Sequence, residues 1–576
     1  MPVTSPSSEP KPDAEPSTAG RRSCLRLIRE TGRDLGWRYP AFVPVAALLS
    51  AVFLLPPRLL QFFADAARAP GDLPADRFVF LLAVFGLAIA AACWVSAYLG
   101  GLLREWLRLR IGVRLRADAL RGIHRTPLEA LDRAGRGDWM TRVTGDLRNV
   151  ENFLADSLPE QIQSLTLATG AAALFVAHSG WVAALPLAAA AGLAWLNLRV
   201  QRRAAPVLRD AREIEGDVFQ SLIENFEGLR TVRGAGAERR LRERFRSRLE
   251  AFYATGMRVI RSMAGLFAVN EFATQFVVAA ALALLAYLLR RGDLTVENVL
   301  VYPFFLNVFL GAAKSLAASA YDWNRFFIEG GRLAEIVFAE DPATVTLPPL
   351  PAETHAVRRL RAEKLEVGHP GAPPLLRDFD FEVARGEIVV LRGPSGSGKT
   401  TLLEVLAGLR KPARGGFRVH GGEESDRVST VFDSVPIALC AHVEQRPWLF
   451  AGTIRENLTL GLDDDAAPAE AVLWERLART GLEAAVRSRG GLDAALSDRG
   501  LNFSEGQRYR LTLSRALLRE RPFLLLDEPF AALDDASIAR LVETLRRARA
   551  DGLGIVLATH QLPPELRPDR VFRLSS

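Results

Sequence analysis

Cysteine and lysine are scarce in this 576-residue chain. The three cysteines, Cys24, Cys93 and Cys440, stand far apart, so they provide neither a metal-binding spacing nor a disulfide framework. Lysine contributes only five of the 73 basic residues, an arginine bias that indicates a GC-rich genome and carries no chemical information. A cleavable signal peptide is also missing, because residues 1–20 are rich in Pro, Ser, Glu and Ala and predict a disordered tail.

The net charge of +7 first suggests a nucleic-acid partner. The arginines, however, gather beside long apolar stretches, where membrane topology favours them. We therefore expect a membrane protein without a nucleic-acid partner.

Six apolar stretches approach the roughly 20 residues that a membrane-spanning helix needs. They cover residues 40–63, 77–103, 160–178, 181–200, 264–289 and 298–320. This pattern predicts an α-helical transmembrane domain over residues 21–338, with six spanning helices.

Orientation follows from the arginines. The connections 104–159 and 201–263 are long and arginine-rich, whereas the other connections are short. We expect both long loops and both termini to lie in the cytoplasm, and the protein to cross the inner (cytoplasmic) membrane. Residues 24–37 predict a helix that lies along the membrane surface before the first span.

Two charged residues interrupt the apolar stretches, Glu271 in the fifth and Lys314 in the sixth. At about 1.5 Å per residue they lie roughly 30 and 24 Å from the outer turn, at a similar depth. Intramembrane charges face a cavity or one another. Two interpretations stay open. One is a charged feature of a substrate cavity; the other is a structural role, as an ion pair or as residues already in the cytoplasmic extension of these helices.

The composition changes after a proline-rich linker, residues 339–358, to that of a soluble α/β domain over residues 359–576. The stretch "GEIVVLRGPSGSGKTTLLEVLAG" predicts a strand, a loop and a helix, and it contains the P-loop pattern Gly-x-x-x-x-Gly-Lys-Thr. The candidate phosphate-binding residues are Gly393, Pro394, Ser395, Gly396, Ser397, Gly398, Lys399, Thr400 and Thr401. Lys399 is expected to reach the β- and γ-phosphates of ATP, and Thr400 to ligate Mg²⁺.

The second half of the nucleotide site is predicted at "PFLLLDEP", residues 522–529. Its apolar run predicts a buried strand with Asp527 at the end, where it would hold Mg²⁺. Glu528 follows and is placed to act as the general base for the attacking water. The two motifs together predict a P-loop ATPase.

The order of motifs from 369 to 560 resembles an ATP-binding cassette (ABC) domain. Gln445 in "VEQRPWLF" is similar to the Q-loop glutamine, which the resemblance implies contacts Mg²⁺. "FSEGQ", residues 503–507, stands at the place of the family signature, usually LSGGQ, and offers Ser504, Gly506 and Gln507 to nucleotide. Asp534 in "ALD" resembles the D-loop aspartate at the dimer seam, and His560 the switch histidine at the γ-phosphate.

The first half resembles exporter-type (type IV) half-transporters, most clearly in the loop segments 127–150 and 224–238. The resemblance implies that these loops carry short coupling helices that dock on the cassettes. The family works with twelve spans and two cassettes, so the resemblance implies a homodimer or a heterodimer with a second half-transporter. ATP would then lie between the P-loop of one cassette and the signature of the other. Fewer than 40 residues precede the first span, too few for the N-terminal peptidase domain of some peptide exporters.

Two positions depart from the family pattern. His369 stands where a tyrosine usually stacks on adenine, which puts nucleotide affinity or base selectivity in doubt. Glu505 places a carboxylate inside the signature. Ser504 and Gln507 have the spacing of a capping box, so Glu505 would lie in the first helical turn, where the helix dipole favours it. Arg508 and Arg510 stand close enough in the sequence to neutralise this carboxylate, and the alternative is a weakened ATP site.

The expected function is ATP-driven export of a lipid, an amphipathic drug or a peptide through a membrane domain that switches between inward- and outward-facing states. The cofactors would be ATP and Mg²⁺. Two alternatives stay open: an importer built on the exporter fold, with siderophore-like cargo, and an ATP-gated channel or regulatory ATPase.

Overall fold

The computed structural model describes residues 18–34, 75–179, 216–292, 296–339, 357–368, 372–421, 429–432, 434–462, 468–531 and 533–574, with isolated positions between 44 and 55 and between 188 and 214. Most of the predicted spans 40–63 and 181–200, nearly all of the linker, His369 and the tail before Thr18 lie outside these residues. The chain divides into two compact units. One comprises residues 1–124 and 138–339, and the other residues 125–137 and 340–576.

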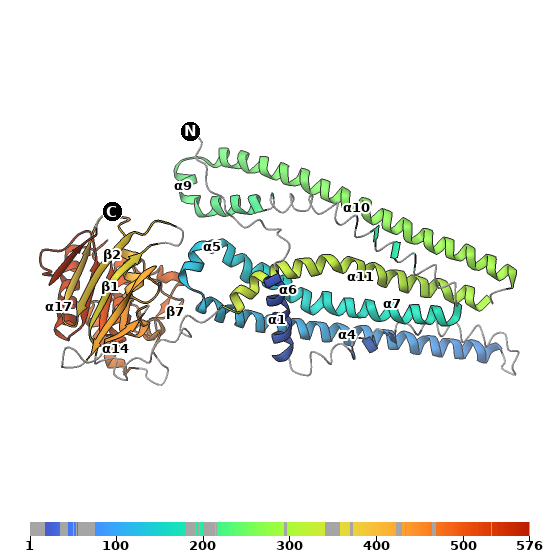
Figure 1. The fold of residues 1–576 in the computed structure, drawn as a ribbon, viewed down its shortest axis with the longest axis horizontal. Helices are drawn as coiled ribbons and strands as arrows, with labels where there is room; N and C mark the ends of the chain where they lie inside the picture. The colour runs from blue at the N-terminus through green and yellow to red at the C-terminus, as the bar shows by residue number, and fades with distance from the viewer. Residues whose placement is uncertain are drawn as a thin grey trace. The chain divides into compact units, whose positions relative to one another are not determined.

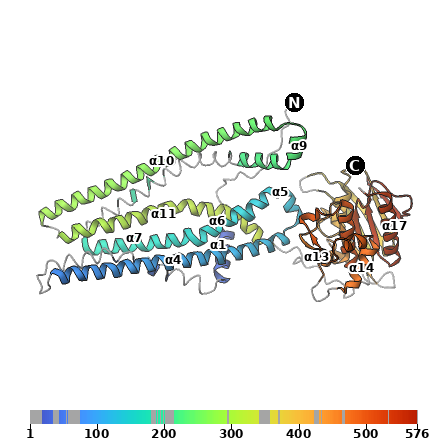
Figure 2. The ribbon, with the colours of Figure 1, turned by 180° about the vertical axis from the view of Figure 1, so that it is seen from behind.

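The first unit is helical. Its long helices are α1 (Thr18–Asp34), α4 (Ala75–Arg125), α7 (Leu158–Ser179), α10 (Glu238–Arg291) and α11 (Val296–Val337). Shorter segments are η2 (Arg142–Asp146), α6 (Leu147–Asn152), η3 (Phe153–Ser157) and α9 (Leu229–Gly234). Figures 1 and 2 both show α7 running between α4 and α11.

Three of the described helices are long and apolar enough to cross a membrane, over Val79–Arg125, Glu238–Arg291 and Tyr302–Val337. They contain the predicted second, fifth and sixth spans, and the predicted third span lies in α7. With 51 residues, α4 is roughly 75 Å long at the usual rise. That length far exceeds the ~30 Å hydrocarbon layer, so the helix continues well beyond a membrane.

The core of this bundle is formed where α7 and α10 pack on α11. Large side chains of α11, among them Tyr302 and Phe305, are buried against the small Ala168 and Ala171 of α7. Small residues at such interfaces let helix backbones approach closely.

The predicted surface helix is present as α1, but it begins at Thr18 and ends at Asp34. Its Cys24 is fully buried, and the thiol donates to the carbonyl oxygens of Phe326 and Phe327 on α11, at 3.8 and 3.4 Å. The helix therefore packs on α11 in addition to any contact with a membrane surface.

Glu271 and Lys314, the two charged residues of the fifth and sixth predicted spans, are partners. The Lys314 ammonium donates to the Glu271 carboxylate at 3.3 Å, and Gln275 donates to the other carboxylate oxygen at 2.8 Å. Both charged side chains stay partly exposed, 27% for Lys314 and 46% for Glu271. The ion pair that was one of the two interpretations is thus present.

The second unit contains two sheets. The five-stranded parallel sheet has the order β11 (Arg570–Arg573), β3 (Ile388–Arg392), β10 (Gly554–Ala558), β9 (Phe523–Asp527) and β6 (Cys440–Val443). The antiparallel sheet has the order β2 (Leu376–Ala384), β1 (Val357–Val367), β4 (Arg414–Gly421) and β5 (Ser429–Phe432). A two-stranded ribbon joins β7 (Gly452–Thr453) to β8 (Ala495–Leu496).

Three helices pack on the parallel sheet: α12 (Lys399–Leu406), α16 (Glu505–Leu518) and α17 (Asp535–Ala550). The helices α13 (Ile454–Thr459), α14 (Glu470–Arg479) and α15 (Glu483–Arg487) pack with α16 in a separate core. The described 3₁₀ turns are Ile437–Leu439 and Asp498–Gly500. Leucines of α12 pack with β1 and β4 in one core, whereas leucines of α16 and α17 pack in a second core. The first turns of α5 (Leu128–Thr141) also belong to this unit.

The register of the parallel sheet aligns the ends of its central strands. Asp527 pairs with Ala558, and Ala558 pairs with Leu391. The segments that follow β3, β9 and β10 therefore emerge together at the carboxyl edge of the sheet, where ligands bind in open α/β folds.

Candidate active site

The loop between β3 and α12 has the predicted strand–loop–helix context. Gly396 and Gly398 adopt φ values of +85° and +86°, in the left-handed region that favours glycine. Gly398 is the N-cap of α12, and no side chain caps that helix. The first amide groups of α12 are therefore open to an anion, as in known phosphate sites.

Lys399 is buried within this loop. Its ammonium donates to the carbonyl oxygens of Gly393 and Pro394, each at 2.9 Å. Among the other predicted phosphate-binding residues, Ser395 is exposed, Thr401 is buried in α12, and the buried Ser397 hydroxyl has no partner among the described residues. The loop thus holds one ammonium and a set of hydroxyl and amide donors.

Thr400 of α12 and Asp527 at the end of β9 lie side by side. The Thr400 hydroxyl donates to one Asp527 carboxylate oxygen at 2.8 Å. The other oxygen is buried and has no partner among the described residues. Burial raises the pKa of Asp527; the Thr400 hydrogen bond opposes this shift, and the charges of Glu528 and Glu404 add to it. The Thr400 hydroxyl and the Asp527 carboxylate present only oxygen atoms, and one Asp527 oxygen is a buried acceptor without a described partner. Such a pair fits a hard cation such as Mg²⁺.

Glu528 and His560 also meet, although 32 residues separate them. Glu528 follows β9 with a φ of +43°, and its amide donates to the Ala558 carbonyl at 2.8 Å. Its carboxylate lies 2.7 Å from Nδ1 of His560. A non-glycine residue in the left-handed region costs free energy and is a sign of a functional constraint.

Gln445 lies two residues after β6, which pairs with β9. Since Val443 is opposite Leu526, the next residues of both strands leave the same edge of the sheet. The exposed Gln445 is therefore on the same side as Asp527.

The signature has the predicted capping box. The backbone amide of Gln507 donates to the Ser504 hydroxyl at 3.3 Å. The backbone amide of Ser504 donates to the side-chain oxygen of Gln507 at 3.2 Å. A Cβ on Gly506 would lie 2.8 Å from a methyl of Leu533. This glycine lets the signature pack against the segment before Asp534, which in turn caps α17 through the Ser537 amide. Hydrogen bonds from Ser537 lower the pKa of Asp534.

The expected neutralisation of Glu505 is not seen in the part of the chain that the structure describes. Arg510 instead donates to the carbonyl oxygens of Gly506 and Gly481, at 3.3 and 3.2 Å. Arg510 therefore points into the cassette, and Glu505 is exposed without an ion pair to it.

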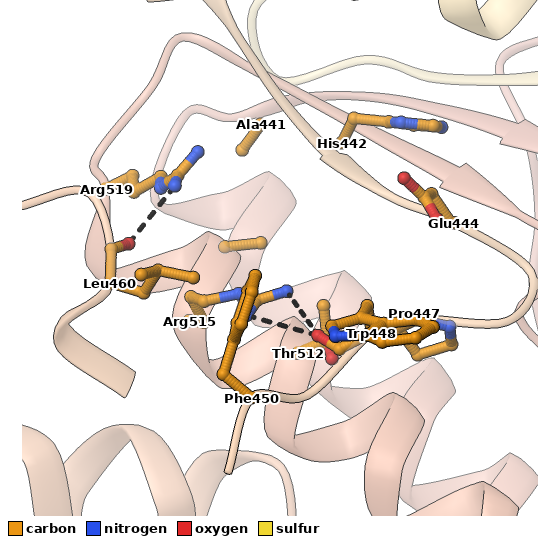
Figure 3. A pocket seen from close by; sticks show the side chains of 11 residues that line it. Ala441, His442, Glu444, Pro447, Trp448, Phe450, Leu460, Thr512, Arg515 and Arg519 are labelled. Atoms are coloured by element: carbon orange, nitrogen blue, oxygen red, sulfur yellow. Dashed lines mark hydrogen bonds between the residues drawn. The ribbon is translucent and has the colours of Figure 1, made fainter. Parts of the chain in front are cut away.

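A cavity of about 230 Å³ lies beside β6, and no sequence motif predicted it. Trp448, Phe450 and the Arg515 side chain line it (Figure 3), and Arg515 donates to the Trp448 carbonyl at 3.5 Å. His442 and Glu444 lie on its other side. Burial lowers the pKa of His442 to about 4 and raises that of Glu444. The aromatic cluster after Gln445 was the only sequence signal for this cavity.

A buried guanidinium joins the segment 127–150 to the cassette, a docking that the family resemblance implied without naming the residues. Arg410 follows α12 and donates to Glu404 at 2.9 Å and to Asp132 of α5 at 2.7 Å. The amide of the next residue, Lys411, donates to Glu129 at 3.1 Å. No local pattern in the sequence signals these contacts, because 278 residues separate Arg410 from Asp132.

These features define a P-loop ATPase cassette in one chain with a helical membrane region. The family model "ABC transporter transmembrane region" matches residues 43–313, and the model "ABC transporter" matches residues 376–531. The chain therefore belongs to the ABC transporters with fused membrane and ATPase domains, and it is an ATP-hydrolysing transporter.

Two curated relatives differ in what their names describe. A multidrug resistance ABC transporter ATP-binding and permease protein of Lactococcus lactis is 26% identical over 77% of this chain and 74% of its own length. A mycobactin import ATP-binding/permease protein of Mycolicibacterium smegmatis is 28% identical over 76% of each chain. A solved structure of a bacterial Atm1-family ABC exporter with ATP bound has a TM-score of 0.81 and 20% identity, covering 94% of this chain and 93% of its own. This likeness shows the exporter-type fold.

Proposed function

We propose that this chain is one half of a dimeric exporter that uses ATP to move a lipid, an amphipathic drug or a peptide out of the cytoplasm. The observation that carries the proposal is the meeting of Thr400 with Asp527 and of Glu528 with His560 at one sheet edge. This hydrolytic group belongs to the same chain as helices apolar enough to span a membrane.

In the proposed reaction, the open first turn of α12 holds the phosphates of ATP, and Lys399 turns from the loop carbonyls toward them. Thr400, Asp527 and Gln445 would hold Mg²⁺, which when bound would neutralise phosphate charge. The Glu528 carboxylate orients the attacking water and accepts its proton. His560 holds that carboxylate in place and contacts the γ-phosphate.

A dimer is proposed because the signature and the P-loop are not in contact with each other in the part of the chain that the structure describes. No hydrogen bond or ion pair among the described residues joins positions 504–507 to the P-loop. The signature would instead complete the ATP site of a second half-transporter, identical or different, with Asp534 at the seam. The arginine-rich loops support a location in the cytoplasmic membrane, with cassettes and termini in the cytoplasm.

The Mycolicibacterium relative supports a second candidate function, import by the same fold. Uptake of labelled cargo into inverted membrane vesicles would indicate export, whereas ATP-dependent release from preloaded inverted vesicles would indicate import. A panel of lipids, drugs and peptides that is also screened for ATPase stimulation identifies the cargo for this assay.

The residue assignments are tested by Glu528→Gln in the full chain in lipid. We expect ATP hydrolysis to fall by about 10²-fold or more while ATP remains bound, because a general base contributes on this scale. Glu543→Gln, which removes an exposed carboxylate from α17, is the control and should hydrolyse ATP like the wild type. Wild-type hydrolysis by Glu528→Gln would show that the base is assigned wrongly.

A further inference from the structure

The two ends of α12 have different partners. Its first residues, Lys399 and Thr400, belong to the proposed ATP site. Just beyond its last turn, Arg410 reaches Asp132 of α5 with one nitrogen and Glu404 with another. A single short helix therefore lies between the ATP site and the first cytoplasmic loop.

Glu404 connects the two ends. It lies four residues after Thr400, so the two side chains share one face of α12. Through Thr400 that face reaches Asp527, and the Glu404 charge acts on Asp527 as well as on Glu444 beside Gln445. Glu404 is thus a negative charge on the α12 face that carries Thr400, and it is not one of the proposed Mg²⁺ ligands.

Arg410 is confined by its surroundings. Its side chain is 4% exposed, against 25% for Glu404 and 57% for Asp132. Arg410, Glu404 and Asp132 together carry a net charge of −1, and loss of the Asp132 contact leaves Arg410 and Glu404 as a neutral pair. The state of the Asp132 contact therefore determines how much of the Glu404 charge remains uncompensated.

We propose that Asp132, Arg410 and Glu404 form a charge relay through which the first cytoplasmic loop tunes the metal affinity of the ATP site. Glu404 is a positioning residue in this relay, because it acts through the electrostatic field at Thr400 and Asp527. The relay rests on the proposed function, since it regulates the same ATP site. When α5 stays on Arg410, Glu404 keeps its negative field and favours the cation. When the contact opens, Arg410 neutralises Glu404 and the cation is held less tightly.

The test is a double-mutant cycle on metal binding in the full chain in lipid. Mn²⁺ is titrated into protein saturated with a non-hydrolysable ATP analogue, and free Mn²⁺ is measured by electron paramagnetic resonance. Glu404→Gln should weaken Mn²⁺ binding about three- to tenfold, because a neighbouring negative charge is lost. Asp132→Asn should weaken it about twofold, and it should add nothing in the Glu404→Gln background, since coupled residues are not additive.

The matched control is Glu129→Gln, which removes a carboxylate from the same helix that accepts only the Lys411 amide among the described contacts. It should leave Mn²⁺ affinity unchanged. Unchanged Mn²⁺ affinity in Glu404→Gln, or an equal effect of Asp132→Asn in both backgrounds, would overturn the relay. Asp132 is exposed, so the Asp132→Asn variant should fold without disturbing the core. Its Mn²⁺ affinity can therefore be compared directly with that of the wild type.

Failure of the relay is distinguishable from failure of the proposed site. Asp527→Asn should abolish tight Mn²⁺ binding if the site is correct. If it does so while the relay variants have no effect, the ATP site stands and the relay is wrong. If Asp527→Asn itself leaves Mn²⁺ binding intact, the metal assignment fails first and the relay with it.

Discussion

The helices α12 and α16 both begin at a motif where phosphate is expected, yet their first turns are built in opposite ways. α12 has a glycine N-cap, Gly398, in the left-handed conformation and no capping side chain. α16 has Ser504 in extended conformation as its N-cap, a reciprocal bond with Gln507, and Glu505 in its first turn.

This difference separates two kinds of phosphate contact. At α12 the amide groups are unsatisfied by side chains, so a ligand can take all of them. At α16 the capping box occupies the Gln507 amide, and a ligand is left with the Gly506 amide and the Ser504 hydroxyl proton. The first turn of α12 can hold phosphates without help from another motif, whereas the first turn of α16 fits the proposed role of completing a site in another chain.

The largest effect is expected where the open turn is disturbed. Gly398→Ala adds a Cβ 3.2 Å from the Cβ of Leu375 and forces alanine to a φ of +86°. We expect ATP binding to weaken more than tenfold and hydrolysis to fall about 10²-fold, because misplaced catalytic groups cost on this scale. Binding of a fluorescent ATP analogue and steady-state hydrolysis measure both.

Gly491→Ala is the control for backbone strain, because Gly491 has a φ of +89° and open space at its Cβ. It should lose a similar free energy of unfolding while hydrolysis is retained. Equal loss of hydrolysis in both variants would mean that strain alone, and not the open turn, explains the effect.

A smaller effect is expected at the closed turn. Gly506→Ala places a methyl 2.8 Å from Leu533, a flexible side chain that can move in part. We expect hydrolysis to fall about tenfold, with recovery in the Gly506→Ala, Leu533→Ala double variant, since contacting residues are coupled. If the double variant is no more active than Gly506→Ala, the lost contact is with nucleotide rather than with Leu533.

Ser504→Ala is expected to lower the free energy of unfolding by about 1 kcal/mol through loss of the cap. Hydrolysis should fall further than this loss explains if the hydroxyl also contacts the nucleotide, as proposed. Thr453→Ala removes the threonine of the equivalent capping box on α13, where no phosphate is expected. The thermal unfolding temperature should decrease by a similar amount in both variants, whereas hydrolysis should fall only in Ser504→Ala. An equal fall of hydrolysis in Thr453→Ala would mean that Ser504 has only a structural role.

Local patterns predicted most of this site. The strand before Lys399, the buried strand that ends at Asp527 and the capping box of Ser504 each follow from residues within a few positions of one another. The pairing of Glu271 with Lys314 was also among the expectations, because two charges at one depth in an apolar layer have few other partners.

Contacts that depend on tertiary packing could not be predicted in this way. Arg410 is one of many arginines, and nothing beside it in the chain indicates Asp132 or its burial. The same limit explains the wrong expectation for Arg510, which sequence distance placed near Glu505 but which packing directs toward the Gly481 carbonyl.

The smallest effect is expected at Glu505 itself. Its carboxylate is exposed and in the first turn of α16, where the helix dipole favours it by roughly 0.3–1 kcal/mol. Glu505→Gly, which restores the usual family glycine, should therefore change hydrolysis by about twofold or less, and Glu505→Gln should behave alike. A gain of tenfold or more in both variants would show that the charge damps the ATP site. Since a homodimer would carry that damping at both sites, such a gain would favour pairing with a different half-transporter whose signature lacks the acid.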